Sequence, residues 1–484
     1  MSTDPAALLD TADATDAAAA IRDGQVTARE LVETAIARAE ERNPALNAFV
    51  STRFDEALAD AESIDVTAPF AGVPFVIKDL GAQIAGLPHT RGSRLFLDDV
   101  AQADSELVAR YRRAGFVVLG TTNAPEMGKN ASTEPVVHGP ARNPHGLNRS
   151  TGGSSGGTAA AVSAGIVPIG HGNDGGGSIR IPSSACGLFG LKPSRGRVTS
   201  APAASLLSYP MGIDHVLTRS VRDSAAVLDL TAGPMPGDPY QIVAPTRPWL
   251  DEVGADPGRL RIGVTTSTRQ GEDAHPDCAT AVDAAAETLR SLGHEVVAAE
   301  PDYPLDDLNT VMRTLMGVPL AVKVDRRLAE LGRELRDDDL EPFTRFMYDS
   351  AAGVPGTEII IAMELVEEIA HTIGAFFVEH DLLLTPTMPQ PAPELGFLDT
   401  TNLEAMYQRA GIYASLTSPF NTTGQPAVSM PLALDSSGVP VGVQLVAAYG
   451  REDVLIRAAS QIEATTPWAT DAVWPAVEAA SVDG

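Results

Sequence analysis

The 484-residue sequence has little cysteine and no long apolar run. Its two cysteines, Cys186 and Cys278, are too few for a disulfide framework, and no Cys/His cluster has the spacing of a zinc site. No stretch approaches the ~18 uninterrupted apolar residues that a membrane span needs. The beginning of the chain also lacks the basic segment and apolar core of a secretory signal. These absences predict a cytoplasmic protein without a metal site and without a membrane partner.

Basic residues are also few: 35 Lys and Arg stand against 63 Asp and Glu, so the formal net charge is −28 at pH 7. Nucleic acids and anionic membranes are bound by basic surfaces that displace counterions, so neither is expected as a partner. Only four of the 35 basic residues are lysines: Lys78, Lys129, Lys192 and Lys323. Apolar residues nevertheless make up 44% of the chain, which is enough for a large folded core.

What the sequence does contain is an alternation of strands and helices. Residues 73–77 read as a buried strand, residues 105–115 as a helix and residues 116–120 as the next strand. A later unit repeats this order, with a helix predicted over residues 279–292. Such alternation indicates the α/β class, with a large, mixed, mostly parallel sheet covered by helices on both faces. The segments "AVSMPLAL" and "VGVQLVA" predict a hairpin near the C-terminus.

No tandem repeat or low-complexity linker divides the chain, so we expect one domain over residues 1–484. Helices are predicted in about residues 1–65, including one that begins with a capping box formed by Thr27 and Glu30. The core is expected in residues 66–260 and 380–484. A variable, mostly helical region over about residues 300–380 is expected to contribute to a substrate pocket. The apolar segments 206–213 and 314–320 have two interpretations, as pocket lining or as part of the core.

The segment "GHGNDGGGSIRIP", residues 170–182, permits two interpretations. Gly170, Gly172 and Gly175 fit G-x-G-x-x-G, the fingerprint of an NAD-dependent dehydrogenase. That fingerprint also requires an acidic residue about 20 positions later, and residues 175–213 contain no Asp or Glu. In the other interpretation, the glycines lead into a nucleophilic Ser178.

Upstream, "TGGSSGGT" places Ser154 in a G-x-S-x-G pattern, the nucleophile elbow of α/β-hydrolases. The elbow requires a preceding strand and a downstream histidine. Residues 138–150 do not read as a strand, and His294, His371 and His380 lie in no catalytic setting. This interpretation is therefore disfavoured.

Lys78 offers a base for a serine nucleophile without histidine. It ends an apolar strand, and strand alternation directs its neighbour Asp79 to the opposite face. Burial disfavours the ammonium form, so it lowers the lysine pKa toward the range of a general base. Each residue alone has a structural explanation: a snorkelling stem for Lys78, a turn for Ser154 and a helix cap for Ser178. The combination of all three favours catalysis.

The run from Gly152 to Pro182 resembles the amidase signature family, including the 24-residue interval between Ser154 and Ser178. The segments "GVPFVIKD", "TTNAPEMG", "CGLFGLKPSRGRV", "TRSVRD", "LLLTPTMP" and "PFNTTGQPAVSMP" extend the resemblance over nearly the whole chain. The resemblance implies the amidase signature fold, no cofactor, and a Ser-cisSer-Lys hydrolase that forms an acyl-enzyme.

The resemblance also assigns roles residue by residue. Ser178 is the expected nucleophile, Ser154 the bridging serine after a cis Gly153–Ser154 bond, and Lys78 the base. An oxyanion hole is expected from the backbone N–H groups of Gly175, Gly176, Gly177 and Ser178, because glycine permits the dihedrals that point them at one spot. Asp174 and Arg180 are expected to position the loop. Met127 and Gly128 are candidates for the substrate pocket, with core packing as the alternative.

Within the family, the motifs look most like the bacterial branch that includes 6-aminohexanoate cyclic-dimer hydrolases and aryl acylamidases. This predicts hydrolysis of small, mostly apolar amides such as anilides or nylon-type oligomers, with esters and carbamates as further possibilities. The alternative is the A subunit of a glutamyl-tRNA amidotransferase, whose loop usually continues "SIRQP" where this chain has Ile181. The expected partner is a small-molecule amide, and the expected state is a monomer or a homodimer.

Overall fold

The computed structural model describes residues 3–202, 204–269 and 273–474 and is built around an eleven-stranded sheet. The strands of this sheet are β1 (Phe49–Thr52), β2 (Pro74–Lys78), β3 (Val117–Thr122), β6 (Ile169–Asp174), β7 (Phe189–Lys192), β8 (Ile213–Thr218), β9 (Arg261–Val264), β10 (Glu295–Ala298), β11 (Leu382–Pro386), β12 (Ala427–Leu434) and β13 (Pro440–Ala447). Their order across the sheet is β1-β3-β2-β6-β8-β7-β12-β13-β11-β9-β10. A separate two-stranded sheet pairs β4 (Arg142–Asn143) with β5 (Gly146–Ser150).

The pairing of the strands is mixed. Strand β2 is parallel to β3 and β6, and β9 is parallel to β10 and β11. The strands that lie between these two groups pair antiparallel. Strand β8 lies between β6 and β7, and the hairpin of β12 and β13 lies between β7 and β11. The predicted α/β class, large mixed sheet and C-terminal hairpin are therefore confirmed. The centre carries more antiparallel pairing than the alternation of elements indicates.

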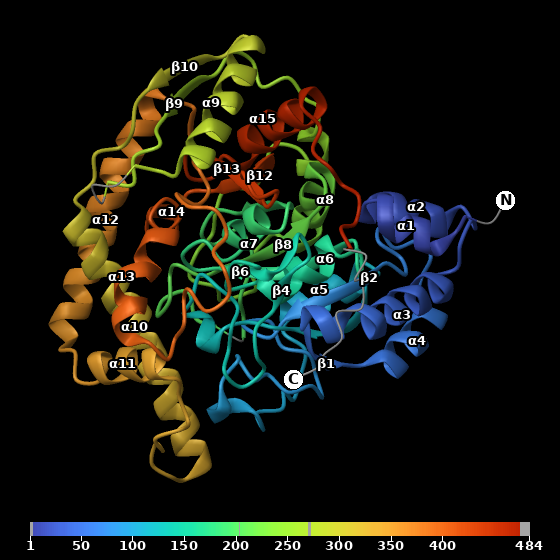
Figure 1. The fold of residues 1–484 in the computed structure, drawn as a ribbon, viewed down its shortest axis with the longest axis horizontal. Helices are drawn as coiled ribbons and strands as arrows, with labels where there is room; N and C mark the ends of the chain where they lie inside the picture. Colours follow the sequence, from blue (N-terminus) through green and yellow to red (C-terminus); the bar gives the residue numbers. More distant parts are fainter. Residues whose placement is uncertain (1–2, 203, 270–272, 475–484) are drawn as a thin grey trace.

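Helices surround the sheet (Figure 1). They are α1 (Pro5–Thr11), α2 (Ala14–Arg22), α3 (Ala28–Leu46), α4 (Phe54–Glu62), α5 (Glu106–Arg113), α6 (Gly156–Ser163), α7 (Arg180–Ala185), α8 (Val221–Thr231), α9 (Pro276–Ser291), α10 (Leu305–Leu331), α11 (Pro342–Ala351), α12 (Gly356–Glu379), α13 (Leu403–Tyr413), α14 (Ser418–Thr423) and α15 (Glu452–Thr465), with short 3-10 turns η1 (Arg94–Phe96), η2 (Glu126–Gly128) and η3 (Trp249–Glu252). The N-terminal helices α1 to α4 lie on one side of the molecule, and α10 to α12 lie on the opposite side. Among the described residues, no helix combines the length and hydropathy needed to cross a bilayer.

Local sequence patterns predicted where several helices begin. Helix α3 begins after Thr27, whose side chain and that of Glu30 form the predicted capping box, and α5 begins after Ser105. Strand β6 begins at Ile169 and continues to Asp174. The sequence also gave no indication of β1, a short strand that pairs antiparallel with β3 at the edge of the sheet.

The helical region packs on the sheet through its own apolar cluster. Leu308 and Val311 of α10 and Ile369 and Ile373 of α12 are buried together with Leu383 of β11. Burial of such side chains stabilises the packing by roughly 1.5–3 kcal/mol each. Because this cluster fixes α10 beside the sheet, one face of the helix is held over the loops that follow β2 and β6.

Candidate active site

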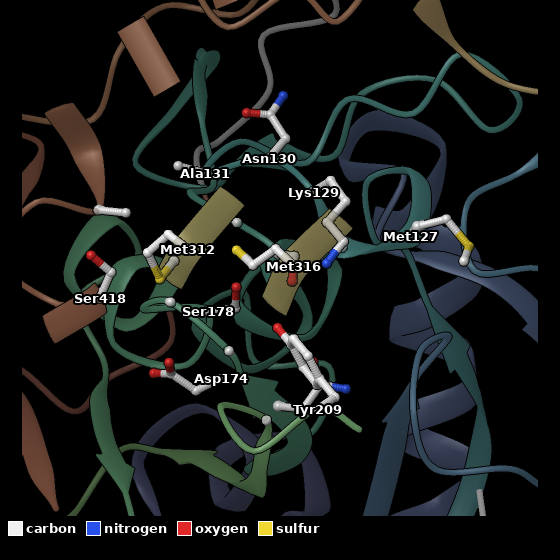
Figure 2. Close-up of a pocket in the computed structure, with 18 of the residues that line it drawn as sticks. Met127, Lys129, Asn130, Ala131, Asp174, Ser178, Tyr209, Met312, Met316 and Ser418 are labelled. Carbon is white, nitrogen blue, oxygen red and sulfur yellow. The ribbon is translucent and has the colours of Figure 1, made fainter. Parts of the chain in front are cut away.

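A cavity of about 320 Å³ lies between the loops that follow the central strands and helix α10 (Figure 2). Its lining includes both candidate serines, Ser154 and Ser178, together with Met127 and Gly128. Residues of the segments 206–213 and 314–320 also border it, in agreement with one of the two interpretations of these segments; these are Leu206, Tyr209, Gly212, Ile213, Met316, Pro319 and Leu320. The structure thus brings the predicted site residues to one place.

Lys78 is the last residue of β2 and is completely buried. Its Nζ lies 2.6 Å from Ser154 Oγ and 2.6 Å from Asn173 Oδ1. Burial lowers the pKa of Lys78 to about 7, although the charges of Asp174 and Asp214 partly oppose the shift. Asp79 faces away and accepts a hydrogen bond from the Thr90 backbone N–H at 2.9 Å. Lys78 can therefore be a neutral amine near neutral pH.

Ser154 reaches Lys78 from the loop before α6. The Gly153–Ser154 peptide bond is cis, as the resemblance implied. The backbone N–H of Ser155 donates to the carbonyl oxygen of Ser178 at 3.3 Å, which joins the two serine loops. Within the described residues, the hydroxyl of Ser178 has no hydrogen-bond partner, so a Ser154–Ser178 bond is not formed in this structure.

The loop that carries Ser178 connects the end of β6 to the beginning of α7. Gly177 has a φ of 134°, a conformation that favours glycine, and a Cβ there would collide with the Thr417 side chain. The backbone N–H of Gly177 donates to Asp174 Oδ1 at 2.6 Å. The prediction that Gly177 contributes to an oxyanion hole is therefore wrong for this structure, because its donor is already used. Among the described residues, the N–H groups of Gly175, Gly176 and Ser178 have no protein acceptor.

Asp174 and Arg180 form a completely buried ion pair at the base of this loop. Arg180 Nε and one terminal nitrogen donate to the Asp174 carboxylate at 2.9 and 3.0 Å. Burial alone would raise the pKa of Asp174, but the charge and hydrogen bonds of Arg180 hold that pKa well below its ordinary value. Arg180 also donates to Gln444 Oε1 at 2.8 Å and to Asn421 Oδ1 at 2.6 Å. The pair therefore ties the loop to the C-terminal part of the chain.

The individual roles of two site residues, Asn173 and Tyr209, were not anticipated, although Tyr209 lies in the segment 206–213. Asn173 accepts from Lys78 Nζ, and its own side-chain nitrogen donates to the Leu80 carbonyl oxygen at 2.6 Å. Tyr209 lies against Gly175, where an added Cβ would collide with its hydroxyl. Asn173 lies inside the glycine motif, directly before Asp174, and this position in the sequence was sufficient to indicate a residue of the site. Nothing in the sequence around Tyr209 indicated that its ring would reach Gly175.

Met127 and Gly128 belong to η2 and border the cavity. Gly128 has a φ of 70°, and a Cβ there would approach Ser154 Oγ to 3.3 Å. Met127 also packs in an apolar cluster with Leu320 and Val324 of α10. The two residues thus join the Ser154 loop to the helical wall of the cavity.

The structure decides both alternative motif interpretations. Gly170 and Gly172 lie inside β6 and not in the strand-to-helix turn that a dinucleotide fingerprint needs. The G-x-S-x-G segment does follow a strand, β5, contrary to expectation, because residues 142–150 form a small hairpin outside the main sheet. Ser154 nevertheless bonds a lysine and not a histidine.

Comparisons with known proteins agree with this geometry. A sequence model of the Amidase family matches residues 30–456. The chain belongs to the Amidase family. It is 40% identical over 472 residues to a 6-aminohexanoate-cyclic-dimer hydrolase of Paenarthrobacter ureafaciens, an alignment that covers 94% of this chain and 95% of the relative.

Solved structures place the chain in the same family. The structure of a 6-aminohexanoate cyclic dimer hydrolase complexed with substrate superposes with a TM-score of 0.89 at 38% identity and covers 94% of this chain and 97% of its own. A bacterial aryl acylamidase of the amidase signature family gives a TM-score of 0.85 at 26% identity, covering 95% and 97%. This Amidase family member is therefore an amide hydrolase with the amidase signature fold.

Proposed function

We propose that the chain hydrolyses small, mostly apolar amides, with Ser178 as nucleophile, Ser154 as bridging serine and Lys78 as base. The observation that carries the proposal is the contact between buried Lys78 Nζ and Ser154 Oγ, at 2.6 Å, beside the cavity that Ser178 lines. A serine hydroxyl is a weak nucleophile until a base removes its proton. Lys78, with a pKa near 7, supplies a base of suitable strength.

In the proposed reaction, the Ser178 hydroxyl first turns toward Ser154. Its proton then moves to Ser154 Oγ while the Ser154 proton moves to Lys78 Nζ, and Ser178 Oγ attacks the amide carbonyl carbon. The resulting tetrahedral intermediate collapses when the relay returns a proton to the leaving amine. A water molecule then gives a proton to the same relay and attacks the carbonyl carbon of the acyl-enzyme. The bond to Ser178 Oγ breaks, the relay returns the proton to Ser178, and the acid is released.

The oxyanion of the intermediate would be held by the free backbone N–H groups of Gly175, Gly176 and Ser178. Donors aimed at developing negative charge in a partly dry site stabilise the transition state, and the loss of one donor typically costs ~3–4 kcal/mol. The Asp174–Arg180 pair positions these amides because Asp174 accepts from Gly177 and Ile179 within the same loop.

The cavity lining favours apolar amides. Leu305, Leu308, Met312 and Met316 of α10 line the cavity together with Ser178 and Ile181. Methionine side chains adapt to ligands of irregular shape. Anilides and amide oligomers fit such a lining, and the similarity to 6-aminohexanoate-cyclic-dimer hydrolase makes that cyclic dimer the first oligomer to test. Esters and carbamates undergo the same acyl transfer and belong in the same panel.

The test is a panel of 4-nitroanilides, the 6-aminohexanoate cyclic dimer, esters and carbamates, assayed with wild type and Ser178→Ala. We expect Ser178→Ala to lower kcat by about a thousandfold or more on every substrate that wild type cleaves. Mass spectrometry of wild type quenched during turnover should find the acyl group on the peptide that contains Ser178. Full turnover by Ser178→Ala, or an acyl group on another residue, would refute the assignment. Turnover only with glutamine and partner subunits would instead indicate an amidotransferase subunit.

A further inference from the structure

Two lysines border the cavity without a role in the proposed reaction. Lys129 follows η2 and Lys323 lies on α10, and together they are half of the lysines in the sequence. Within the described part of the chain, neither side chain forms an ion pair or a hydrogen bond. The two acids that border the same space do have partners. Asp174 is paired with Arg180, and Asp214 accepts from Ser200 Oγ at 2.8 Å.

The ammonium of Lys129 is held in place by an aromatic ring. Its Nζ lies 5.2 Å from the centroid of the Tyr209 ring, a cation–π contact. Figure 2 shows the Lys129 amine directed toward the space beside Met316 and the Tyr209 hydroxyl directed toward Ser178. Burial and the charge of Lys323 lower the pKa of Lys129 to about 7. Two lysine amines therefore border one apolar cavity, and an anion between them would favour the charged form of both.

We infer that Lys129 and Lys323 bind a carboxylate of the substrate. The preferred substrates are then amides whose apolar part ends in a carboxylate, such as N-acyl aminobenzoates or mono-amides of dicarboxylic acids. This inference rests on the proposed function and names its substrate class. Charge-assisted hydrogen bonds from two ammonium groups would hold the carboxylate, while methionine and leucine side chains of α10 contact the apolar part.

A carboxylate suits this site better than a phosphate. Among the described lining residues there is no arginine, the side chain that best matches a phosphate group by paired hydrogen bonds. Asp214 borders the same cavity, so a second negative charge on the ligand would be repelled. One carboxylate between two lysines avoids that repulsion.

The experiment uses two matched pairs of substrates. For the acyl side, the mono-4-nitroanilide of glutaric acid is compared with the 4-nitroanilide of pentanoic acid. For the amine side, 4-(pentanoylamino)benzoate is compared with N-(4-methylphenyl)pentanamide. We expect the charged member of at least one pair to have a kcat/KM about tenfold higher or more, since hydrogen bonds to charged groups are among the stronger ones.

Lys129→Met and Lys323→Met should each remove most of this preference by raising KM for the charged substrate, with little change for the neutral one. Lys323→Arg keeps a positive charge and should keep the preference. Arg326→Met is the matched control because Arg326 is exposed on the same helix but does not border the cavity. It removes one positive charge and should leave both substrates unchanged. Thermal unfolding checks that each variant is folded.

Calorimetric binding to Ser178→Ala separates this inference from the proposed reaction. The intact charged substrate should bind about tenfold more tightly than its neutral partner, and the added Lys129→Met change should remove the difference. Equal binding of both members of both pairs, or no effect of either lysine variant, would overturn the carboxylate site even if Ser178 is the nucleophile. Tight lysine-dependent binding together with full turnover by Ser178→Ala would refute the nucleophile and leave the carboxylate site standing.

Discussion

The hydroxyl of Tyr209 occupies the space that a β-carbon on Gly175 would need. Gly175→Ala should therefore displace Tyr209 or the loop before Ser178 and lower kcat by about ten- to a hundredfold, because small displacements of catalytic groups have large effects. Tyr209→Phe removes the colliding oxygen, so the double variant should recover part of the lost activity. Steady-state kinetics of the two single variants and the double variant measure this coupling. Additive losses would show that the two residues do not compete for space.

The pKa of Lys78, lowered to about 7 by burial, sets the expected pH dependence. Only the neutral amine can accept a proton, so kcat/KM should rise with pH through about 7 and level off above it. The profile is measured with a neutral anilide. Because the pKa of Lys129 is also about 7, Lys129→Met is the control and should keep the same ionisation. Loss of the ionisation in that variant would assign it to Lys129.

Asn173 should act as a positioning residue for Lys78. Its Oδ1 lies 2.6 Å from Lys78 Nζ. Asn173→Asp places a negative charge there, which favours the ammonium and should move the rise of kcat/KM to higher pH by about one to three units. Asn173→Ala should lower kcat without such a shift to higher pH. An unchanged pH profile in Asn173→Asp would show that the contact does not govern the ionisation.

Removal of the charge at Asp174 should destabilise the fold. Asp174→Asn leaves buried Arg180 without its carboxylate, and breaking one partner of a buried pair costs about 3–5 kcal/mol. Since Arg180 holds the pKa of Asp174 low, this stabilisation is complete above the ordinary aspartate pKa of about 3.9 and is lost as the pH falls below it. Denaturant unfolding should therefore show a difference between wild type and Asp174→Asn that shrinks in acid. A difference that is constant with pH would contradict the paired-charge explanation.

The sequence predicted the parts of the site that depend on local motifs. Lys78, Ser154 and Ser178 lie where the strand pattern and the glycine segments placed them, and the segments 206–213 and 314–320 border the cavity, which is one of the two interpretations open for them. Gly177 was placed wrongly because a glycine run shows that unusual dihedrals are possible but not which amide a nearby carboxylate accepts.

Contacts between residues that are far apart in the sequence could not be predicted from local sequence patterns. Tyr209 reaches Gly175 from a loop between β7 and β8, and Arg180 bonds Gln444 across 264 positions of sequence. The edge strand β1 was missed because only four residues form it, too few for periodicity to distinguish it from a loop. Antiparallel pairing at the centre of the sheet likewise depends on which strands become neighbours and not on any single segment.

The bonds from Arg180 to Asn421 and Gln444 have a consequence for the timing of biosynthesis. When the ribosome has made every residue of the proposed triad, the side chains that brace the loop beneath Ser178 are still more than two hundred residues from synthesis. The nascent chain would thus contain Lys78, Ser154 and Ser178 before the residues that position the Ser178 loop have been synthesised. Catalytic activity would therefore appear only late in synthesis, when β12 and β13, the last strands of the sheet, have been added.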